Sequence, residues 1–324
     1  MRATFNPSEE TSTTQDRALV SIERNFGPLL TAALADPNTV ELMLNADGQL
    51  WCERLGEGMA CIGTLPAARA EALIKTVAGY HRKEITRQAP FFEGLFPLDG
   101  SRFAAQLPPI VSAPTFAIRK RAIAVYRLEQ YVEQGIMTER QRDVLMAAIQ
   151  ARKNILVVGG TGSGKTTLVN ALIQTSVDLF PHLRVCILED TAEIRCAAEN
   201  CVQYYTTLDM PMAKLLRITM RMRPDTILVG EVRGPEALDM LMAWNSGHEG
   251  GFATLHANHA RAGLSKLAMY ISMNLEYPKP IEPLIAEAVH VVVHIARSAA
   301  GRRVGEILHV AGYANGDYLT QPLM

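Results

Sequence analysis

The spacing of hydrophobic and polar residues changes along the chain. In the first part, segments with helical spacing are mixed with segments whose pattern is typical of strands. Residues 1–15 are polar, lack periodicity and are predicted to be disordered. Apolar side chains in residues 16–36 recur at helical spacing, which predicts one amphipathic helix that stops before Pro37. Short apolar runs separated by turn-forming residues follow in residues 40–62 and predict a meander of strands.

The next elements complete a first domain. A second helix is predicted from Ala67 to about Lys83, because Pro66 favours a helix start. Residues 91–121 hold further short strands interrupted by glycine and proline. Residues 16–121 are therefore predicted to form a small α+β domain.

A linker, residues 122–137, separates this domain from the second part of the chain and contains a short helical pattern. Thr138 and Gln141 then have the spacing of a capping box, which predicts the start of a helix. The linker is therefore predicted to end where a new domain begins.

Beyond the linker, apolar runs alternate with helical segments, a rhythm typical of a parallel sheet. The predicted parallel strands are residues 155–158, 185–188, 202–205, 226–229 and 252–255. Two last strands, residues 289–295 and 306–313, are predicted to pair with each other. Residues 138–324 are therefore predicted to form one α/β domain.

Composition narrows the class of protein. Of the 324 residues, 48% are hydrophobic and 20% are charged, as in an ordinary globular protein, and a net charge of −1 predicts no strong nucleic-acid binding. The five cysteines form no CxxC pair, so a zinc site is not indicated. No apolar run approaches the ~20 residues of a membrane span. The N-terminus lacks a signal-peptide core, so a cytoplasmic protein without a transmembrane segment is expected.

The stretch from Val157 to Thr167 reads VVGGTGSGKTT and has the spacing of a phosphate-binding P-loop. It follows an apolar strand and leads into a helix, so its backbone N–H groups are expected to surround a phosphate at the helix N-terminus. We expect Lys165 to face solvent and reach the β- and γ-phosphates of ATP, and Thr166 to hold Mg²⁺. The expected nucleotide-binding residues of the loop are Gly159, Gly160, Thr161, Gly162, Ser163, Gly164, Lys165, Thr166 and Thr167.

Two further strand ends present carboxylates where the phosphates are expected. One reads ILEDTAEI and includes Glu189 and Glu193, and the other reads TILVGEVR and includes Glu231. Generic P-loop enzymes carry an aspartate where Gly230 stands here. Glu231 is expected to orient and deprotonate the attacking water, while Mg²⁺ is left to Thr166, phosphate oxygens and waters held by Glu189.

Four motifs, GGTGSGKTT, ILEDTAEI, RMRPDTILVGEVRG and GHEGGFATLHA, occur in the order Walker A, Asp box, Walker B and His box. The chain thereby resembles the secretion or traffic ATPase family. The segments RFAAQLPP and PTFAIRKR look most like its TrbB-type conjugative-transfer branch. The resemblance covers about residues 90–324. It implies an α/β fold in which a RecA-like P-loop NTPase domain follows a smaller α+β domain, with ATP and Mg²⁺ bound and ATP hydrolysed.

The resemblance also implies roles for individual residues. Glu189 and Glu193 match the acids of the Asp box, and Glu231 matches the glutamate expected to act as general base. His256 matches the His-box residue expected to sense the γ-phosphate. These four residues, together with Lys165, are the candidate catalytic residues of the second domain.

Three arginines of the first domain, Arg102, Arg119 and Arg121, match residues expected to close on the phosphates, with Arg119 as the candidate catalytic residue. Because an arginine from a second rigid body makes hydrolysis depend on domain closure, the linker is expected to be a hinge. The resemblance further implies a homo-hexameric ring. Such a ring is expected to associate peripherally with the inner membrane through components of a secretion or conjugation apparatus.

Alternative functions stay open at this point. The cysteine-rich zinc subdomain common in type II secretion ATPases is absent, which disfavours that branch, and a pilus-retraction motor is a further alternative. A soluble nucleic-acid translocase such as a RecA-like helicase shares the P-loop and the ring, but no basic-aromatic strip supports it. The sequence does not distinguish pilus assembly from protein export or DNA transfer.

Overall fold

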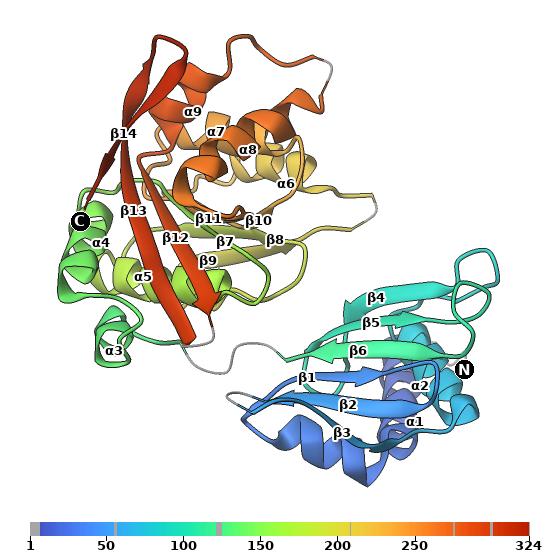
Figure 1. Cartoon of the computed structure of the whole chain (residues 1–324). Coiled ribbons are helices and arrows are strands. Elements are labelled where there is room, and N and C mark those ends of the chain that lie inside the picture. Colours follow the sequence, from blue (N-terminus) through green and yellow to red (C-terminus); the bar gives the residue numbers. More distant parts are fainter. Residues whose placement is uncertain are drawn as a thin grey trace. The chain divides into compact units, whose positions relative to one another are not determined.

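The chain folds around two β-sheets, one in each of two compact units, residues 1–123 and residues 124–324 (Figure 1). The predicted limits 16–121 and 138–324 lie within these units, and the precise ends of the domains stay a prediction. This computed structural model describes residues 7–54, 57–120, 125–207, 209–274, 276–298 and 301–323, and the side chains from residue 15 onward.

The N-terminal unit is a six-stranded antiparallel sheet with two helices packed on one face. The strand order is β3-β2-β1-β6-β5-β4. Alternate strand residues such as Leu42, Phe103 and Ile118 are fully buried in one core with α1 and α2, because side chains alternate between the two faces of a strand. The elements are α1 (Pro7–Ala35), β1 (Thr39–Leu44), β2 (Gln49–Arg54), β3 (Gly58–Thr64), α2 (Ala67–Tyr80), β4 (Phe91–Leu95), β5 (Arg102–Gln106) and β6 (Thr115–Arg119).

Helix α1 differs from the prediction in its start and in its interior. It begins at Pro7, inside the segment predicted to be disordered, whose first six residues lie outside the described part of the chain. Gly27 has φ 75° and ψ 171°, and Pro28 follows it, so a kink breaks the single helix that the spacing predicts. At the kink, Arg69 of α2 donates a hydrogen bond of 2.7 Å to the carbonyl oxygen of Asn25, which satisfies a carbonyl group that the break exposes.

The C-terminal unit is an eight-stranded sheet in the order β14-β13-β12-β7-β11-β10-β8-β9. The strands from β12 to β9 run parallel, and β13 and β14 extend the sheet as antiparallel strands. Its elements are α3 (Leu128–Glu133), α4 (Glu139–Gln150), β7 (Ile155–Gly159), α5 (Lys165–Leu179), β8 (Val185–Glu189), β9 (Cys201–Tyr205), α6 (Met212–Thr219), β10 (Thr226–Val232), α7 (Ala237–Trp244), β11 (Phe252–His256), α8 (Ala260–Ser272), α9 (Glu282–Ala288), β12 (Val291–Ser298), β13 (Gly301–Ala314) and β14 (Asp317–Pro322).

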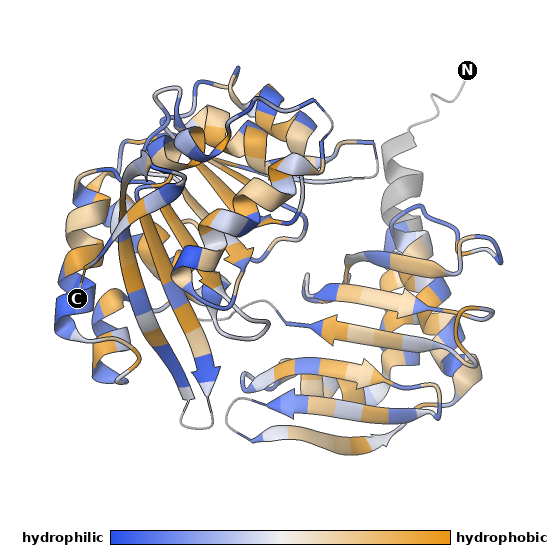
Figure 2. Cartoon of the chain, turned by 45° about the horizontal axis from the view of Figure 1, so that its top comes forward, coloured by the Kyte–Doolittle hydropathy of each residue, from blue (hydrophilic) through white to orange (hydrophobic). Residues whose placement is uncertain are grey.

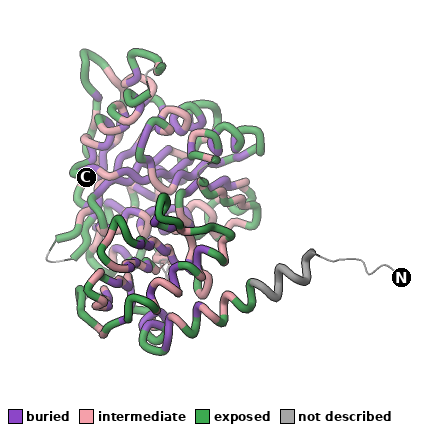
Figure 3. The backbone as a smooth tube through the Cα atoms, turned by 90° about the vertical axis from the view of Figure 1, so that its right-hand side faces the viewer, coloured by how far each residue is buried: buried purple, intermediate pink, exposed green. Residues whose placement is uncertain are grey.

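The central strands of this sheet are apolar along their whole length because helices cover both faces. In β7, Leu156 and Val158 belong to the core formed with α6 to α9, whereas Ile155 and Val157 belong to the core formed with α3 to α5. The central strands are predominantly hydrophobic in Figure 2, and Figure 3 shows long buried stretches of chain in the interior of this unit. Parallel strands end at one edge of the sheet, so β7, β11, β10 and β8 deliver the residues that follow them to the same place.

Several predicted features of this unit are confirmed. The capping box is formed: Thr138 Oγ1 accepts a hydrogen bond of 3.2 Å from the Gln141 N–H, and Gln141 Oε1 accepts one of 2.9 Å from the Thr138 N–H. The predicted pairing of the last two strands is the β12–β13 hairpin. Strand β14 is not predicted, because it is a mostly polar edge strand in which Tyr318 is the buried side chain.

In the described part of the chain, no helix combines the length and the apolarity that crossing a bilayer requires.

Candidate functional site

The predicted P-loop connects β7 to α5 and has the backbone of an anion-binding loop. Gly162 and Gly164 have φ values of 68° and 97°, a region that suits glycine and lets consecutive N–H groups turn toward one side. A Cβ at Gly159 would overlap the carbonyl oxygen of Ile295, so β12 packs against the loop where no side chain fits. The buried hydroxyl oxygen of Ser163 lacks a hydrogen-bond partner among the described residues. Buried polar groups are normally hydrogen-bonded, so this hydroxyl is consistent with a loop that binds a polar ligand.

The rest of the loop lies where nucleotide contact is expected. Gly160 and Thr161 are exposed, and Thr166 and Thr167 are partly buried at the start of α5. An anionic ligand at this helix N-terminus is favoured by the partial positive charge of the helix dipole. The loop therefore fits a phosphate group.

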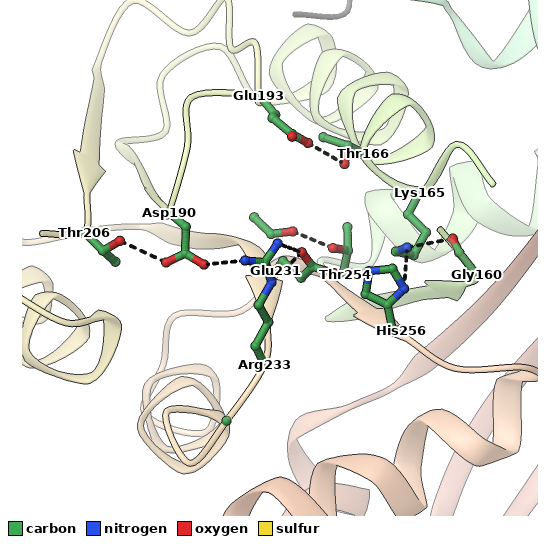
Figure 4. Close-up of polar contacts among 12 residues, drawn as sticks. Gly160, Lys165, Thr166, Asp190, Glu193, Thr206, Glu231, Arg233, Thr254 and His256 are labelled. Atoms are coloured by element: carbon green, nitrogen blue, oxygen red, sulfur yellow. Dashed lines mark hydrogen bonds and ion pairs between the residues drawn. The ribbon is translucent and has the colours of Figure 1, made fainter. Parts of the chain in front are cut away.

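Lys165 is buried, with 8% of its surface exposed, and the expectation that it faces solvent is wrong. It is the first residue of α5, and its Nζ donates a hydrogen bond of 3.0 Å to the carbonyl oxygen of Gly160. The same Nζ lies 3.4 Å from Nδ1 of His256 (Figure 4). The side chain thus folds back over the loop because the carbonyl group and the imidazole nitrogen accept from an ammonium that burial removes from water.

The acidic loop after β8 is held by its own first carboxylate. Glu189 is 2% exposed, and its Oε1 accepts hydrogen bonds from the backbone N–H groups of Glu193 (2.9 Å) and Ile194 (2.7 Å). Glu193 in turn accepts a hydrogen bond of 3.2 Å from Thr166 Oγ1 in α5 (Figure 4). Glu189 therefore shapes the loop that brings Glu193 to the first turn after the P-loop.

Gly230 explains why the aspartate of generic P-loop enzymes is replaced in this chain. Strands β8 and β10 are parallel neighbours with Leu188 opposite Val229, so the next positions are Glu189 and Gly230. A Cβ at Gly230 would lie 2.9 Å from Cγ of Glu189, closer than ordinary van der Waals contact. The buried Glu189 therefore occupies the space that a side chain at position 230 would need, and the carboxylate of this strand comes one residue later, at Glu231.

Glu231 lies at the centre of a row of polar contacts that crosses the end of the sheet (Figure 4). Its Oε1 is 2.7 Å from Nε2 of His256, and its Oε2 accepts hydrogen bonds from Nε (2.8 Å) and Nη2 of Arg233. Arg233 also pairs with Asp190 at 3.3 Å, and Asp190 accepts a hydrogen bond of 2.9 Å from the hydroxyl of Thr206. The row thus joins residues that lie at or directly after the ends of four parallel strands, β11, β10, β8 and β9.

The imidazole of His256 connects this row to the P-loop lysine. Burial lowers the pKa of His256, the charge of Lys165 lowers it further, and the carboxylate of Glu231 acts in the opposite direction. A neutral imidazole is consistent with the Lys165 contact, since its Nδ1 then accepts from Lys165, while Nε2 stays 2.7 Å from Oε1 of Glu231, an atom without a hydrogen-bond partner among the described residues.

Arg233 and Asp190 are site residues that the sequence analysis does not assign. Arg233 stands two positions after Glu231, directly after the end of β10 at Val232. That spacing is a usable signal in the sequence. The pairing with Asp190 depends on the adjacency of β8 and β10, which the sequence does not reveal.

Two of the predicted arginines lie side by side in the N-terminal unit. Arg102 of β5 is directly opposite Arg119 of β6, which is opposite Glu41 of β1. Phe116 is buried and Arg119 is exposed, as the alternation of β6 predicts. Burial raises the pKa of Glu41, and the charge of Arg119 opposes that shift.

The contact of Arg102 and Arg119 with phosphate stays a prediction. The third arginine, Arg121, lies outside the described residues. The predicted linker also includes undescribed residues, 122–124, so its role as a hinge stays a prediction as well.

The site holds few metal ligands of its own. Among the described residues, no group of three or more His, Cys, Asp or Glu side chains could hold a metal ion. The hydroxyl of Thr166 with the carboxylates of Glu193 and Glu189 is a sparse, all-oxygen set of donors. That set fits Mg²⁺, which keeps several waters and binds through one or two protein groups together with substrate phosphates.

Comparison with known proteins places this geometry in a family. A family model described as Type II/IV secretion system protein matches residues 100–311. The conjugal transfer protein TrbB of Rhizobium radiobacter is 46% identical over 305 residues, which cover 94% of each protein. The type IV secretion system protein PtlH of Bordetella pertussis is 32% identical over 320 residues, which cover 86% of this chain and 92% of PtlH.

A solved structure shares the fold. The crystal structure of the pilus retraction motor PilT with bound ADP has a TM-score of 0.63 at 20% identity, and the match covers 86% of this chain and 80% of that one. The predicted fold class, an α/β protein with a RecA-like P-loop domain after a smaller α+β domain, is confirmed. The chain belongs to the type II/IV secretion system protein family.

Proposed function

We propose that this protein is an ATP hydrolase that powers a type IV secretion apparatus for conjugative DNA transfer. The observation that carries the proposal is the contact between the P-loop lysine, Lys165, and the pair formed by His256 and Glu231. This contact places a candidate phosphate-binding group, Lys165, close to a candidate general base, Glu231, at one edge of the sheet. The names of the relatives support the cellular role, since one is a conjugal transfer protein and another a type IV secretion system protein.

ATP binding falls to the loop between β7 and α5. The backbone N–H groups of residues 159–167 receive the phosphates, and Lys165 exchanges the carbonyl oxygen of Gly160 for the β- and γ-phosphate oxygens. Thr166, Glu193 and Glu189 would hold Mg²⁺ directly or through water. The ion would supply charge neutralisation on the phosphates.

Water activation falls to Glu231. Its Oε2 already accepts from Arg233, whereas its buried Oε1, 2.7 Å from Nε2 of His256, has no hydrogen-bond partner among the described residues. A carboxylate has about four lone-pair sites, so Glu231 retains room for the attacking water. Glu231 takes the proton of that water as the water oxygen bonds to the γ-phosphorus, while the bond from this phosphorus to the bridging oxygen breaks and ADP leaves with that oxygen. His256 lies next to both Lys165 and Glu231, and its contacts change when the γ-phosphate is bound, so it senses that phosphate.

The motor requires more than one subunit and more than one unit of the chain. Arg102, Arg119 and Arg121 close on the phosphates when the linker, residues 122–137, bends, and hydrolysis releases them. Six copies form a ring in the cytoplasm. The ring pushes on inner-membrane components of the apparatus, which supply the membrane contact.

The test is the Lys165→Ala variant, measured both as purified protein and in donor cells that lack the wild-type chain. ATP hydrolysis and DNA transfer are expected to fall about 100-fold or more, because the phosphates lose a preorganised charge. The matched control is Lys214→Ala, at an exposed lysine of α6, which should hydrolyse ATP normally. Turnover by Lys165→Ala at the wild-type rate would contradict the site assignment.

Normal hydrolysis by the wild-type protein, with transfer unaffected by Lys165→Ala, would retain the ATPase and reject the role in conjugation.

A further inference from the structure

The β12–β13 hairpin brings two arginines against the glycines of the P-loop. Nη1 of Arg297 lies 3.9 Å from where a Cβ of Gly162 would stand. Cδ and Nε of Arg302 lie 3.1 and 3.3 Å from the corresponding position at Gly164. Since both glycines adopt the positive φ of an anion-binding loop, the two guanidinium groups lie beside the turn that receives phosphate.

The two arginines form a like-charge pair across the hairpin. Arg297 and Arg302 are directly opposite each other in the register of β12 and β13, and like charges in that position destabilise a sheet. Both side chains are exposed, so they are accessible to a ligand. None of the salt bridges among the described residues involves Arg302.

The order of strands shows which end of a nucleotide the pair would meet. Strand β7 has β11 on one side and β12 on the other. His256 ends β11 and Glu231 lies on β10, so the groups for the γ-phosphate occupy the β11 side. Arg297 and Arg302 stand on the opposite side of the P-loop, where the α-phosphate and the nucleoside lie when the γ-phosphate faces Glu231.

We propose that Arg297 and Arg302 form a second phosphate clamp of this protein, which binds the α-phosphate of the nucleoside di- or triphosphate held by the P-loop. This proposal rests on the proposed function. The planar guanidinium group matches phosphate oxygens with paired hydrogen bonds, and two of them relieve their mutual repulsion by sharing one anion. The packing of the Arg302 stem against Gly164 fixes the distance between this clamp and the loop.

The experiment measures the dissociation constants of ATP and ADP for purified Arg297→Ala and Arg302→Ala by titration calorimetry. Each variant is expected to bind both nucleotides about tenfold more weakly, the effect of a lost hydrogen bond to a charged group. The losses for ATP and ADP should be equal, because both nucleotides carry the α-phosphate. The KM for ATP should rise in the same proportion.

Arg303→Ala is the matched control. Arg303 is the exposed neighbour of Arg302, lies opposite Ala296 and projects to the other face of β13, so its removal should leave both affinities unchanged. Arg302→Lys keeps the charge and most of the stem that packs on Gly164. It is expected to bind with intermediate affinity, which separates lost phosphate contact from a disturbed loop.

The outcomes separate this proposal from the proposed function. Wild-type affinity in both alanine variants would overturn the clamp while leaving the ATPase intact. A loss confined to ATP would also overturn it, since the pair would then meet the γ-phosphate. A wild-type protein that binds neither nucleotide would overturn the proposed function and the clamp together.

Discussion

At the scale of single residues, Glu231 provides the sharpest test of the chemistry. Glu231→Gln keeps the shape of the side chain but removes the base, so the variant should bind ATP with near wild-type affinity and hydrolyse it about 100-fold to 1,000-fold more slowly. Nucleotide titration and phosphate release measure the two properties separately. Glu199→Gln, at an exposed acid in the loop before β9, is the control and should behave like the wild type.

Weak nucleotide binding by Glu231→Gln, with unchanged turnover per bound ATP, would instead assign Glu231 to holding the metal ion. The hydrogen bonds of Arg233 make that distinction meaningful, because they fix the side chain in place whether it is ionised or amidated.

The identities of most site residues could be predicted from the sequence, but their contacts could not. The motif spacing identifies Lys165 and Glu231 because it reports which residue types follow each strand. The buried Lys165 contacts His256, far along the chain, and Arg297 meets the P-loop because β12 pairs with β7. Such contacts follow from the order of strands, which local patterns do not encode.

At the scale of elements, most strands could be predicted because their apolar runs are continuous in the buried sheet. The kink of α1 could not, since the helical spacing of apolar residues continues on both sides of Gly27. The edge strand β14 was not predicted because its buried and exposed residues do not alternate regularly. The pattern of hydrophobic residues therefore predicted the elements best where their side chains are most completely buried.

The junction of β7 and β12 predicts how stability depends on pH. Nδ1 of His290 accepts a hydrogen bond of 3.0 Å from the backbone N–H of Asn154, and burial, followed by the charge of Lys153, lowers the pKa of His290. Protonation would remove the acceptor. His290 therefore binds a proton at a higher pH in the unfolded chain than in the folded chain. The free energy of unfolding decreases as the pH falls below about 6.5, the ordinary pKa of histidine.

Unfolding by urea at pH 7.5 and pH 5.5 measures this effect. The free energy of unfolding should be lower at pH 5.5, and His290→Gln should show a smaller difference between the two pH values. A part of the dependence should remain in that variant, because burial also lowers the pKa of His256 and His294. A wild-type protein that gains stability on acidification over this range would contradict the prediction.

At the scale of the whole molecule, Arg119 tests whether the two units cooperate. If Arg119 meets the γ-phosphate on closure, Arg119→Ala should leave ADP affinity nearly unchanged, weaken ATP binding modestly and lower turnover by about 1,000-fold or more. Arg119→Lys should not restore full activity, because a point charge does not copy the planar fork. Arg87→Ala, at an exposed arginine of the same unit, is the control. Equal losses for ADP and ATP would remove Arg119 from the γ-phosphate.

The ring is a separate prediction at this scale. Light scattering in the presence of ATP and Mg²⁺ should give the mass of six chains of 35.5 kDa, because the proposed motor couples the closure of neighbouring subunits. The same measurement without nucleotide reports whether assembly depends on closure. A monomer at every concentration would exclude the ring mechanism but not the ATPase.

The row of contacts in Figure 4 has a mechanical consequence for such an assembly. It visits β11, β10 and β8 in their spatial order and finishes at Thr206, directly after β9, the outermost strand of the sheet. Arg233 carries the positive charge between the carboxylates of Glu231 and Asp190, so displacing Arg233 leaves both carboxylates without their counter-charge. The row therefore gives a continuous chain of polar contacts from the P-loop side of the sheet to its β9 edge, and an edge strand carries unpaired backbone groups that another chain can bind.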